Sequence, residues 1–149
     1  MRPITASQVV RRPPKEVFGF VALDYARNHP RWDPMVTGTV NETGGAVRLG
    51  TRFVERRRLL GFPVNNVVDV TEFESDRGFS VRTTGGPIKR SVRWFFEPIP
   101  EGTHLRVSWE GTVGSPLRVL EGSLLARAQA ELESALANVK QLLESPSSK

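Results

Sequence analysis

The longest patterned stretch of the sequence, residues 115–144, most restricts how the chain can fold. Its apolar side chains recur at steps of three and four residues, which places them on one stripe of an α-helix. Ser115 and Pro116 suit the N-cap and the first helical position. A helix with one apolar stripe needs a surface against which to bury it. The stripe consists of Leu117, Leu120, Leu124, Ala128, Leu132, Ala135, Val139 and Leu142.

The segments before this helix predict a sheet that supplies such a surface. One strand is expected at residues 4–11, followed by two short helices at 15–23 and 25–30, the second of which Pro30 should end. Gly102, in the last hairpin loop, is expected to adopt a positive φ. The prediction is a single α+β domain over residues 1–149, in which a seven-stranded, curved antiparallel sheet wraps around the C-terminal helix. The six later strands are predicted at 35–42, 51–60, 64–73, 79–84, 88–98 and 103–113.

Composition limits the classes of function that this chain can have. It has no cysteine, which excludes disulfides, thiolate nucleophiles and cysteine-based metal sites. Its two histidines are too few for an ordinary histidine-rich metal site, and we predict neither a metal nor a cofactor. The sequence contains no apolar run long enough to cross a membrane and no apolar signal region at its start. A cytoplasmic protein is therefore expected.

The formal net charge of +5 is distributed unevenly, because residues 48–93 hold ten basic and five acidic side chains. This excess could attract anionic ligands, lipid headgroups or nucleic acid. An arginine-rich, solvated outer face is the favoured interpretation. No nucleic-acid-binding motif is present, so no nucleic acid partner is expected. The sequence leaves open whether the protein is a monomer or a homodimer.

Six short pieces of sequence, in this order, carry a family resemblance: residues 13–18, 30–34, 50–53, 70–74, 102–105 and 136–143. With the predicted order of strands and helices, they resemble the helix-grip fold of the START-like (SRPBCC) superfamily, and most closely its bacterial polyketide cyclase/dehydrase-like members. The resemblance implies a cavity between sheet and helix that binds lipids, polyketides or other hydrophobic molecules. Only some members catalyse a reaction. We expect binding of a small hydrophobic molecule, with a cyclase, aromatase or dehydrase acting by acid/base catalysis as the alternative.

Strand 51–60 has two faces of equal apolar content, and only one of them can line a cavity. One face carries Phe53, Glu55 and Arg57, whereas the other carries Arg56 and Arg58. We interpret the first face as inward, because it buries opposite charges that can pair. Glu55 and Arg57 are then candidates for a polar contact with a ligand. The alternative is that they pair at the cavity rim or lie outside.

Further ligand-binding candidates lie on the other predicted inner faces and on the terminal helix. The tryptophans could stack on an aromatic ligand or be ordinary core residues. Asn66 could offer its amide to a ligand or pair with the backbone. This set consists of Trp32, Asn66, Val68, Val81, Thr83, Trp94, Trp109, Leu120 and Leu124.

The candidate acids and bases are Glu55, Tyr25, His29 and Asp69. Tyr25 and His29 flank the helical corner, and His29 is the only histidine placed to act as a general base, since His104 lies on a polar strand face. A surface position beside proline is nevertheless the favoured expectation for His29. Asp69 is expected to be solvated, unless its strand is turned so that it becomes a buried carboxylate with a raised pKa. No Ser-His-Asp or comparable constellation is evident.

Overall fold

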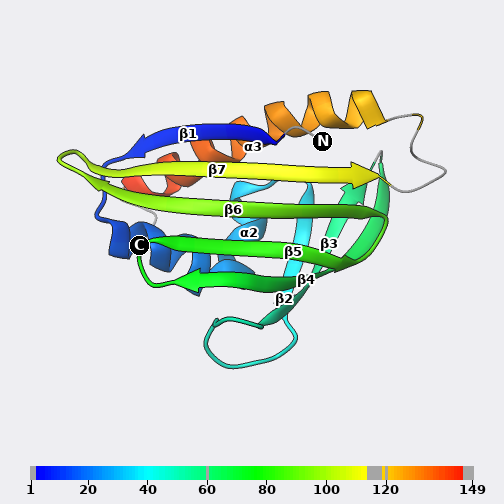
Figure 1. Ribbon diagram of the computed structural model, residues 1–149, viewed down its shortest axis with the longest axis horizontal. Helices are drawn as coiled ribbons and strands as arrows, with labels where there is room; N and C mark the ends of the chain where they lie inside the picture. The colour runs from blue at the N-terminus through cyan, green and yellow to red at the C-terminus, as the bar shows by residue number, and fades with distance from the viewer. Residues whose placement is uncertain (1–2, 60, 114–118, 120, 146–149) are drawn as a thin grey trace.

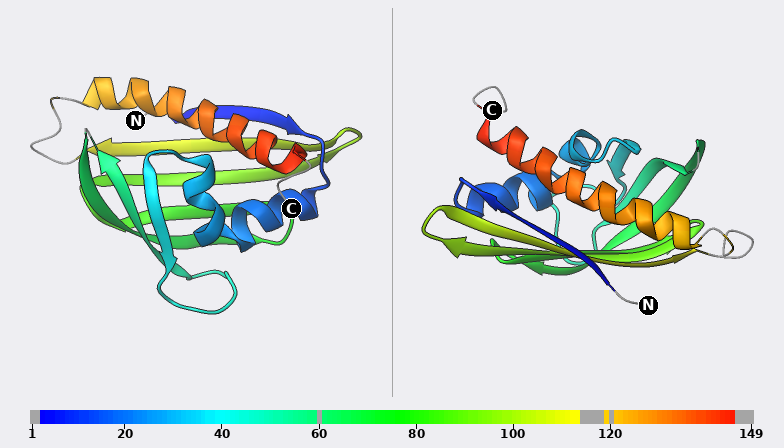
Figure 2. Two further views of the ribbon diagram at one scale, coloured as in Figure 1. Left: turned by 180° about the vertical axis from the view of Figure 1, so that it is seen from behind. Right: turned by 90° about the horizontal axis from the view of Figure 1, so that it is seen from above.

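The computed structural model describes residues 3–59, 61–113, 119 and 121–145. Its seven strands form one antiparallel sheet in the order β1-β7-β6-β5-β4-β3-β2, and the long helix α3 lies across the concave face (Figures 1 and 2). The predicted helix-grip architecture is confirmed. The elements are β1 (Ile4–Val10), α1 (Pro14–Phe18), the π-helical turn η1 (Gly19–Leu23), α2 (Tyr25–Trp32), β2 (Val36–Asn41), β3 (Arg52–Leu59), β4 (Phe62–Glu74), β5 (Gly78–Gly85), β6 (Ile88–Ile99), β7 (Gly102–Val113) and α3 (Glu121–Glu144).

The strands that are adjacent in sequence at the start of the chain, β1 and β2, lie at opposite edges of the sheet. β1 returns to pair with β7, with Ile4 opposite Trp109 and Val10 opposite Thr103. The segment α1–η1–α2 therefore spans the concave side between the two edges, as Figure 2 shows. Register shifts in the β2–β3 and β4–β5 ladders add local twist to the sheet. This curvature lets α2 and α3 share one enclosed interior.

The apolar stripe of α3 is buried against the sheet and α2. Leu132, Ala135 and Val139 are buried as predicted, and Leu136 and Leu143, which the predicted stripe left out, are buried beside them. Predicted positions at the start of the helix lie outside the described residues: Ser115, Pro116, Leu117, Leu120 and the side chain of Leu124. No helix within the described ranges is long and apolar enough to cross a bilayer.

Two predicted boundaries were wrong, and in both cases the helix or strand tolerates a proline. The helix α2 continues through Pro30 to Trp32, because proline removes a single backbone donor and the Asp33 amide still bonds to the His29 carbonyl at 3.0 Å. Likewise β4 begins at Phe62, with Pro63 paired opposite Arg58. Pairing of β4 with β5 starts only at residue 67, so the missing donor of Pro63 lies on an open edge.

Gly102 has the positive φ expected of it, at 140°. A Cβ at this position would collide with the backbone carbonyl of Val10 on the neighbouring strand. We expect Gly102→Ala to lower the free energy of unfolding by about 1–3 kcal/mol, because it combines backbone strain with a steric clash. Urea unfolding measures this change.

Gly122→Ala is the control for this prediction. Gly122 lies in α3 with open space around its Cα, so alanine there should raise the free energy of unfolding by about 0.5–1 kcal/mol. Equal effects of the two substitutions would contradict the described hairpin geometry.

Candidate functional site

A cavity of about 150 Å³ lies between α3, α2 and the concave face of the sheet. All three tryptophans of the chain, Trp32, Trp94 and Trp109, line it. Polar side chains occupy its side toward α2, β3 and β6. The wall also includes Tyr25, His29, Asp33, Met35, Arg57, Arg58, Leu59, Gly61, Val81, Arg90, Val92, Gly111, Leu125, Arg127, Ala128, Glu131, Leu132 and Ala135.

The helix α2 contributes an aromatic face to the cavity. Tyr25, His29 and Trp32 follow one another at steps of four and three, which places them on the same side of the helix. The ring of Trp32 lies 5.7 Å from that of Trp94 on β6 and 5.9 Å from that of Tyr25. The side-chain amide of Asn138 on α3 donates to the Trp32 carbonyl at 2.9 Å, and so fixes the end of α2 beside the cavity.

A buried ion cluster centred on Glu55 lies next to the cavity. The side chain of Glu55 is 1% exposed, and Nη2 of Arg90 donates to its two oxygens at 2.7 and 2.8 Å. Asn66, opposite Glu55 in the β3–β4 register, donates its amide at 2.9 Å. Arg57 connects the cluster to Asp33, with Nε 3.3 Å from Glu55 and Nη2 2.8 Å from the Asp33 carboxylate.

The arginines keep Glu55 ionised despite its burial. Burial alone would raise the pKa of this carboxyl group, but the guanidinium groups of Arg90 and Arg57 outweigh that effect and hold the pKa well below its usual range. Burial alone would lower the pKa of Arg57. The nearby carboxylates of Glu55 and Asp33 outweigh this effect, so the pKa of the guanidinium lies above its usual value. The cluster is therefore a network of charged groups, and Arg57 and Arg90 present parts of it to the cavity.

His29 lies inside the protein, so the expected surface position was wrong. It is 4% exposed, because α2 continues past Pro30 and packs against β2, where Nδ1 lies 3.0 Å from Oγ1 of Thr39. Its ring stacks on Tyr25 at 4.5 Å, and Nε2 lies 3.7 Å from Glu55. Burial lowers the pKa of His29 to about 4, even though Glu55 acts in the opposite direction. Burial, aided by Glu55, raises the pKa of Tyr25, so both rings are neutral near pH 7.

The lowered pKa of His29 predicts an acid-sensitive protein. Between pH 6.5 and 4 the unfolded chain binds a proton at this residue and the native protein does not, so stability falls as the pH falls through this window. The loss should approach about 3 kcal/mol, since each unit of difference between the two pKa values corresponds to about 1.4 kcal/mol. Urea unfolding at a series of pH values measures it.

Substituting each histidine in turn isolates this contribution. His29→Gln should make the dependence of unfolding free energy on pH between 6.5 and 4 shallower, and the contribution of Glu55 should remain at the acid end of this range. His104→Gln is the control, because His104 lies on the β6–β7 hairpin beside Glu97, and it should keep the wild-type slope. An unchanged slope in His29→Gln would show that His29 titrates normally in the native protein.

The structure brings together most of the residues singled out from the sequence. The inward orientation of strand 51–60 is confirmed, since Phe53 and Glu55 are fully buried while Arg56 and Arg58 are exposed. Asn66 reaches Glu55 and so lies behind the cavity wall. Those on the cavity wall are Tyr25, His29, Trp32, Arg57, Val81, Trp94 and Trp109.

Other candidates lie apart from the cavity. Phe53 and Val68 are core residues that do not line it, and Thr83 lies in a separate depression of the sheet. Asp69 points outward and pairs with Arg52 at 2.8 Å, so the buried alternative for this carboxylate was wrong. Leu120 and the Leu124 side chain fall outside the described residues.

Arg90 is the main residue that the sequence analysis missed. It is 8% exposed and supplies the shortest hydrogen bonds to Glu55. The available signal was a single arginine on the otherwise apolar face of strand 88–98, which is an unusual position unless a buried carboxylate compensates it. In the described part of the chain, no group of three or more histidine, aspartate or glutamate side chains is arranged to hold a metal ion.

Comparison with known proteins identifies relatives of this fold. Residues 1–144 match the family model described as polyketide cyclase / dehydrase and lipid transport. The protein TTHA0849 from Thermus thermophilus is similar in structure, with a TM-score of 0.81, 16% identity and coverage of 97% of this chain and 99% of that one. A START superfamily protein from Mycobacterium smegmatis has a TM-score of 0.66 and 16% identity, covering 93% and 99%.

One similar structure contains two domains. The di-domain ARO/CYC protein BexL from the BE-7585A biosynthetic pathway has a TM-score of 0.73 and 20% identity, and the match covers 98% of this chain and 48% of BexL. Because the sequence identities to these three structures are only 16–20%, the structural similarities establish the fold and nothing more. No curated protein sequence matches the chain.

Proposed function

The chain belongs to the polyketide cyclase/dehydrase and lipid transport family, and we propose that it binds a small hydrophobic molecule in the cavity beneath α3. The observation that carries this proposal is the meeting of three tryptophans and Arg90 around one partly enclosed space. Indole rings offer wide apolar faces on which a planar ligand can stack. The volume of the cavity is that of about one benzene ring, and because the cavity is partly open to solvent, a longer chain can extend out of it.

The polar side of the cavity supports a ligand that carries an oxygen substituent. Both hydrogen bonds from Arg90 to Glu55 use Nη2, and they leave Nε and Nη1 outside that pair. A carbonyl, enol or carboxylate oxygen could accept a hydrogen bond from this guanidinium. The hydroxyl of Tyr25 is a second donor on the same wall. An oriented ring with one oxygen directed toward Arg90 fits both sides of the cavity.

Acid/base catalysis by Tyr25 and His29 is the alternative use of the cavity. Efficient proton transfer requires a pKa near the working pH. Burial moves the pKa of His29 down to about 4 and that of Tyr25 upward, away from neutrality in both cases. For Tyr25 and His29, these directions suit hydrogen bonding by neutral rings better than proton transfer, and favour a binding role for these two residues.

Intrinsic fluorescence tests the binding proposal, because all the tryptophans of the chain line the cavity. We expect saturable changes in tryptophan emission on titration with cyclohexylacetic acid, decanoic acid and their corresponding alcohols, none of which absorbs at the excitation wavelength. Calorimetry on the same samples should give a 1:1 stoichiometry. A complete absence of saturable change across acids and alcohols would contradict the proposal. Chemical conversion of a bound compound would support the catalytic alternative.

A further inference from the structure

The sheet is split where β5 and β6 approach their connecting turn. Their last paired residues are Arg82 and Ser91, although β5 continues to residue 85 and β6 starts at residue 88. Beyond that pair, Thr83 is opposite Val68 of β4, whereas Arg90 is opposite Gly111 of β7. The two strands therefore part and follow different neighbours.

The turn itself holds the strands apart. Gly86 has a φ of 121°, and a Cβ at this position would collide with the side-chain oxygen of Asn66 on β4. Only glycine allows this close approach, which draws the end of β5 toward β4. The split is thus built by the sequence of the hairpin.

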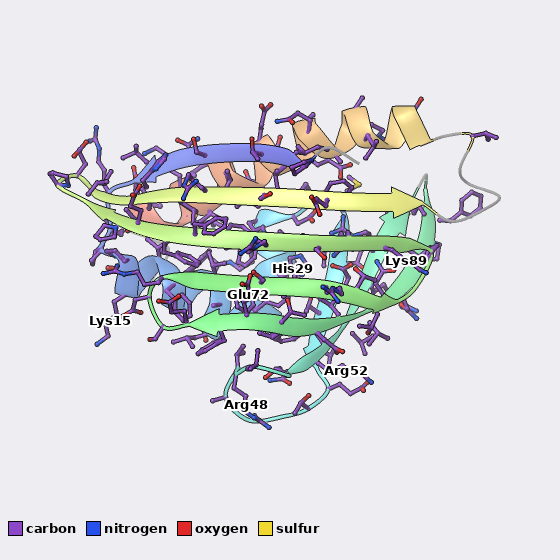
Figure 3. All side chains as sticks on the ribbon, viewed as in Figure 1. Lys15, His29, Arg48, Arg52, Glu72 and Lys89 are labelled. Carbon is purple, nitrogen blue, oxygen red and sulfur yellow. The ribbon has the colours of Figure 1, made fainter. Side chains whose placement is uncertain are left out.

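A depression occupies the split and carries an excess of positive charge. Arg82, Lys89 and Arg90 line it together with a single carboxylate, that of Glu110. Figure 3 shows Lys89 at this end of the sheet, far from Lys15 at the opposite end. Arg90 also lines the cavity beneath α3, so this residue borders both spaces. Because Glu55 already compensates the charge of Arg90, the excess comes from Arg82 and Lys89 against Glu110, and it favours an anion in the depression.

The hydroxyl of Thr83 is an independent sign of a missing partner. Thr83 is 7% exposed and lines the depression, and among the described residues its Oγ1 has no hydrogen-bond partner. Burial of an unpaired hydroxyl is unfavourable, and such groups usually meet a ligand, an ion or a water molecule. Thr83 can donate to an oxygen atom whose negative charge Arg82 and Lys89 balance.

We propose that the split between β5 and β6 is a binding site for a small oxyanion, a carboxylate or a phosphate group. Thr83 donates a hydrogen bond to the anion, Arg82 and Lys89 supply the positive charge, and Arg90 offers the guanidinium nitrogens that Glu55 does not use. The oxyanion is either a free ion from solution or the acidic group of a molecule whose apolar part lies in the cavity beneath α3. Only the second source rests on the proposed function.

Amide chemical shifts of the ¹⁵N-labelled protein test the site with inorganic phosphate at constant ionic strength. Phosphate should perturb the amides of residues 83, 89–91 and 111 in a saturable manner. Thr83→Val and Lys89→Gln should each weaken binding at least about tenfold, whereas Lys15→Gln, an exposed lysine on α1, should leave it unchanged. Without phosphate, Thr83→Val should melt no lower than wild type, because the lost hydroxyl has no partner among the described residues.

Competition distinguishes the two sources of the anion. If the acidic group belongs to a cavity ligand, decanoate should displace phosphate while decanol should bind without displacing it. If the anion is free, phosphate should remain bound in the presence of either compound. Perturbations spread over all basic residues, or equal affinity in wild type and Thr83→Val, would overturn the proposal. A failure of the oxyanion site can be told apart from a failure of the proposed cavity, because the binding of decanol tests the cavity alone.

Discussion

Replacing Glu55 with glutamine is expected to lower the free energy of unfolding by about 3–5 kcal/mol, a large part of the stability of a protein of this size. The substitution removes the carboxylate that faces Arg90 and Arg57, whose side chains are 7% and 13% exposed. Arg57 keeps Asp33 as a partner, but Arg90 is left buried without a compensating charge. Equilibrium unfolding in urea, at the pH of maximum stability, measures the loss.

An exposed ion pair on the same sheet provides the matched control. Glu72 pairs with Arg93 at 3.0 Å with both side chains about half exposed, and Figure 3 labels Glu72 on the sheet. Glu72→Gln should cost less than about 1 kcal/mol. The double substitution Glu55→Leu with Arg90→Leu should recover part of the loss, since two apolar groups can replace a buried pair. Equal effects of Glu55→Gln and Glu72→Gln would show that the cluster is solvated.

Filling the cavity from α3 is expected to weaken ligand binding strongly while the fold is kept. Ala128 lines the cavity and is half-buried, and the ring that phenylalanine adds is close in size to the available space. We expect Ala128→Phe to weaken binding of decanoate and cyclohexylacetate by about 100-fold, which is about 3 kcal/mol of binding free energy. Calorimetric titration measures the change.

Ala130→Phe is the control for the filled cavity, because Ala130 lies two residues further along α3 and is exposed. It should bind both compounds with wild-type affinity. Melting temperatures of the two variants should lie close to that of wild type. Unaltered binding in Ala128→Phe would place the ligand elsewhere on the protein.

The architecture could be predicted because its signals are periodic and local. Steps of three and four residues mark α3, and alternation marks the strands, so neither depends on knowing which elements touch. The same logic failed at α2, where Pro30 was expected to end the helix. His29 was consequently expected at the surface, whereas the extra turn places it against Thr39.

The candidate site was only partly predictable, since it depends on contacts between distant strands. The charge-pairing argument oriented Glu55 and Arg57 correctly within one strand. Arg90 lies 35 residues from Glu55 in sequence, and only the sheet register brings the two side chains together. Thr83 was correctly expected on an inner face, but the splitting of β5 from β6 moves it out of the cavity, and no local pattern signals that split.

Native mass spectrometry of the purified protein tests the central claim, a cavity that holds a small hydrophobic molecule, most directly. We predict a 1:1 adduct, either carried through purification or formed on addition of decanoate or cyclohexylacetate, that raises the melting temperature through linkage. The adduct should be absent from Ala128→Phe and present in Ala130→Phe. The claim would be contradicted if the wild-type protein showed no adduct and if none of the added compounds changed its melting temperature.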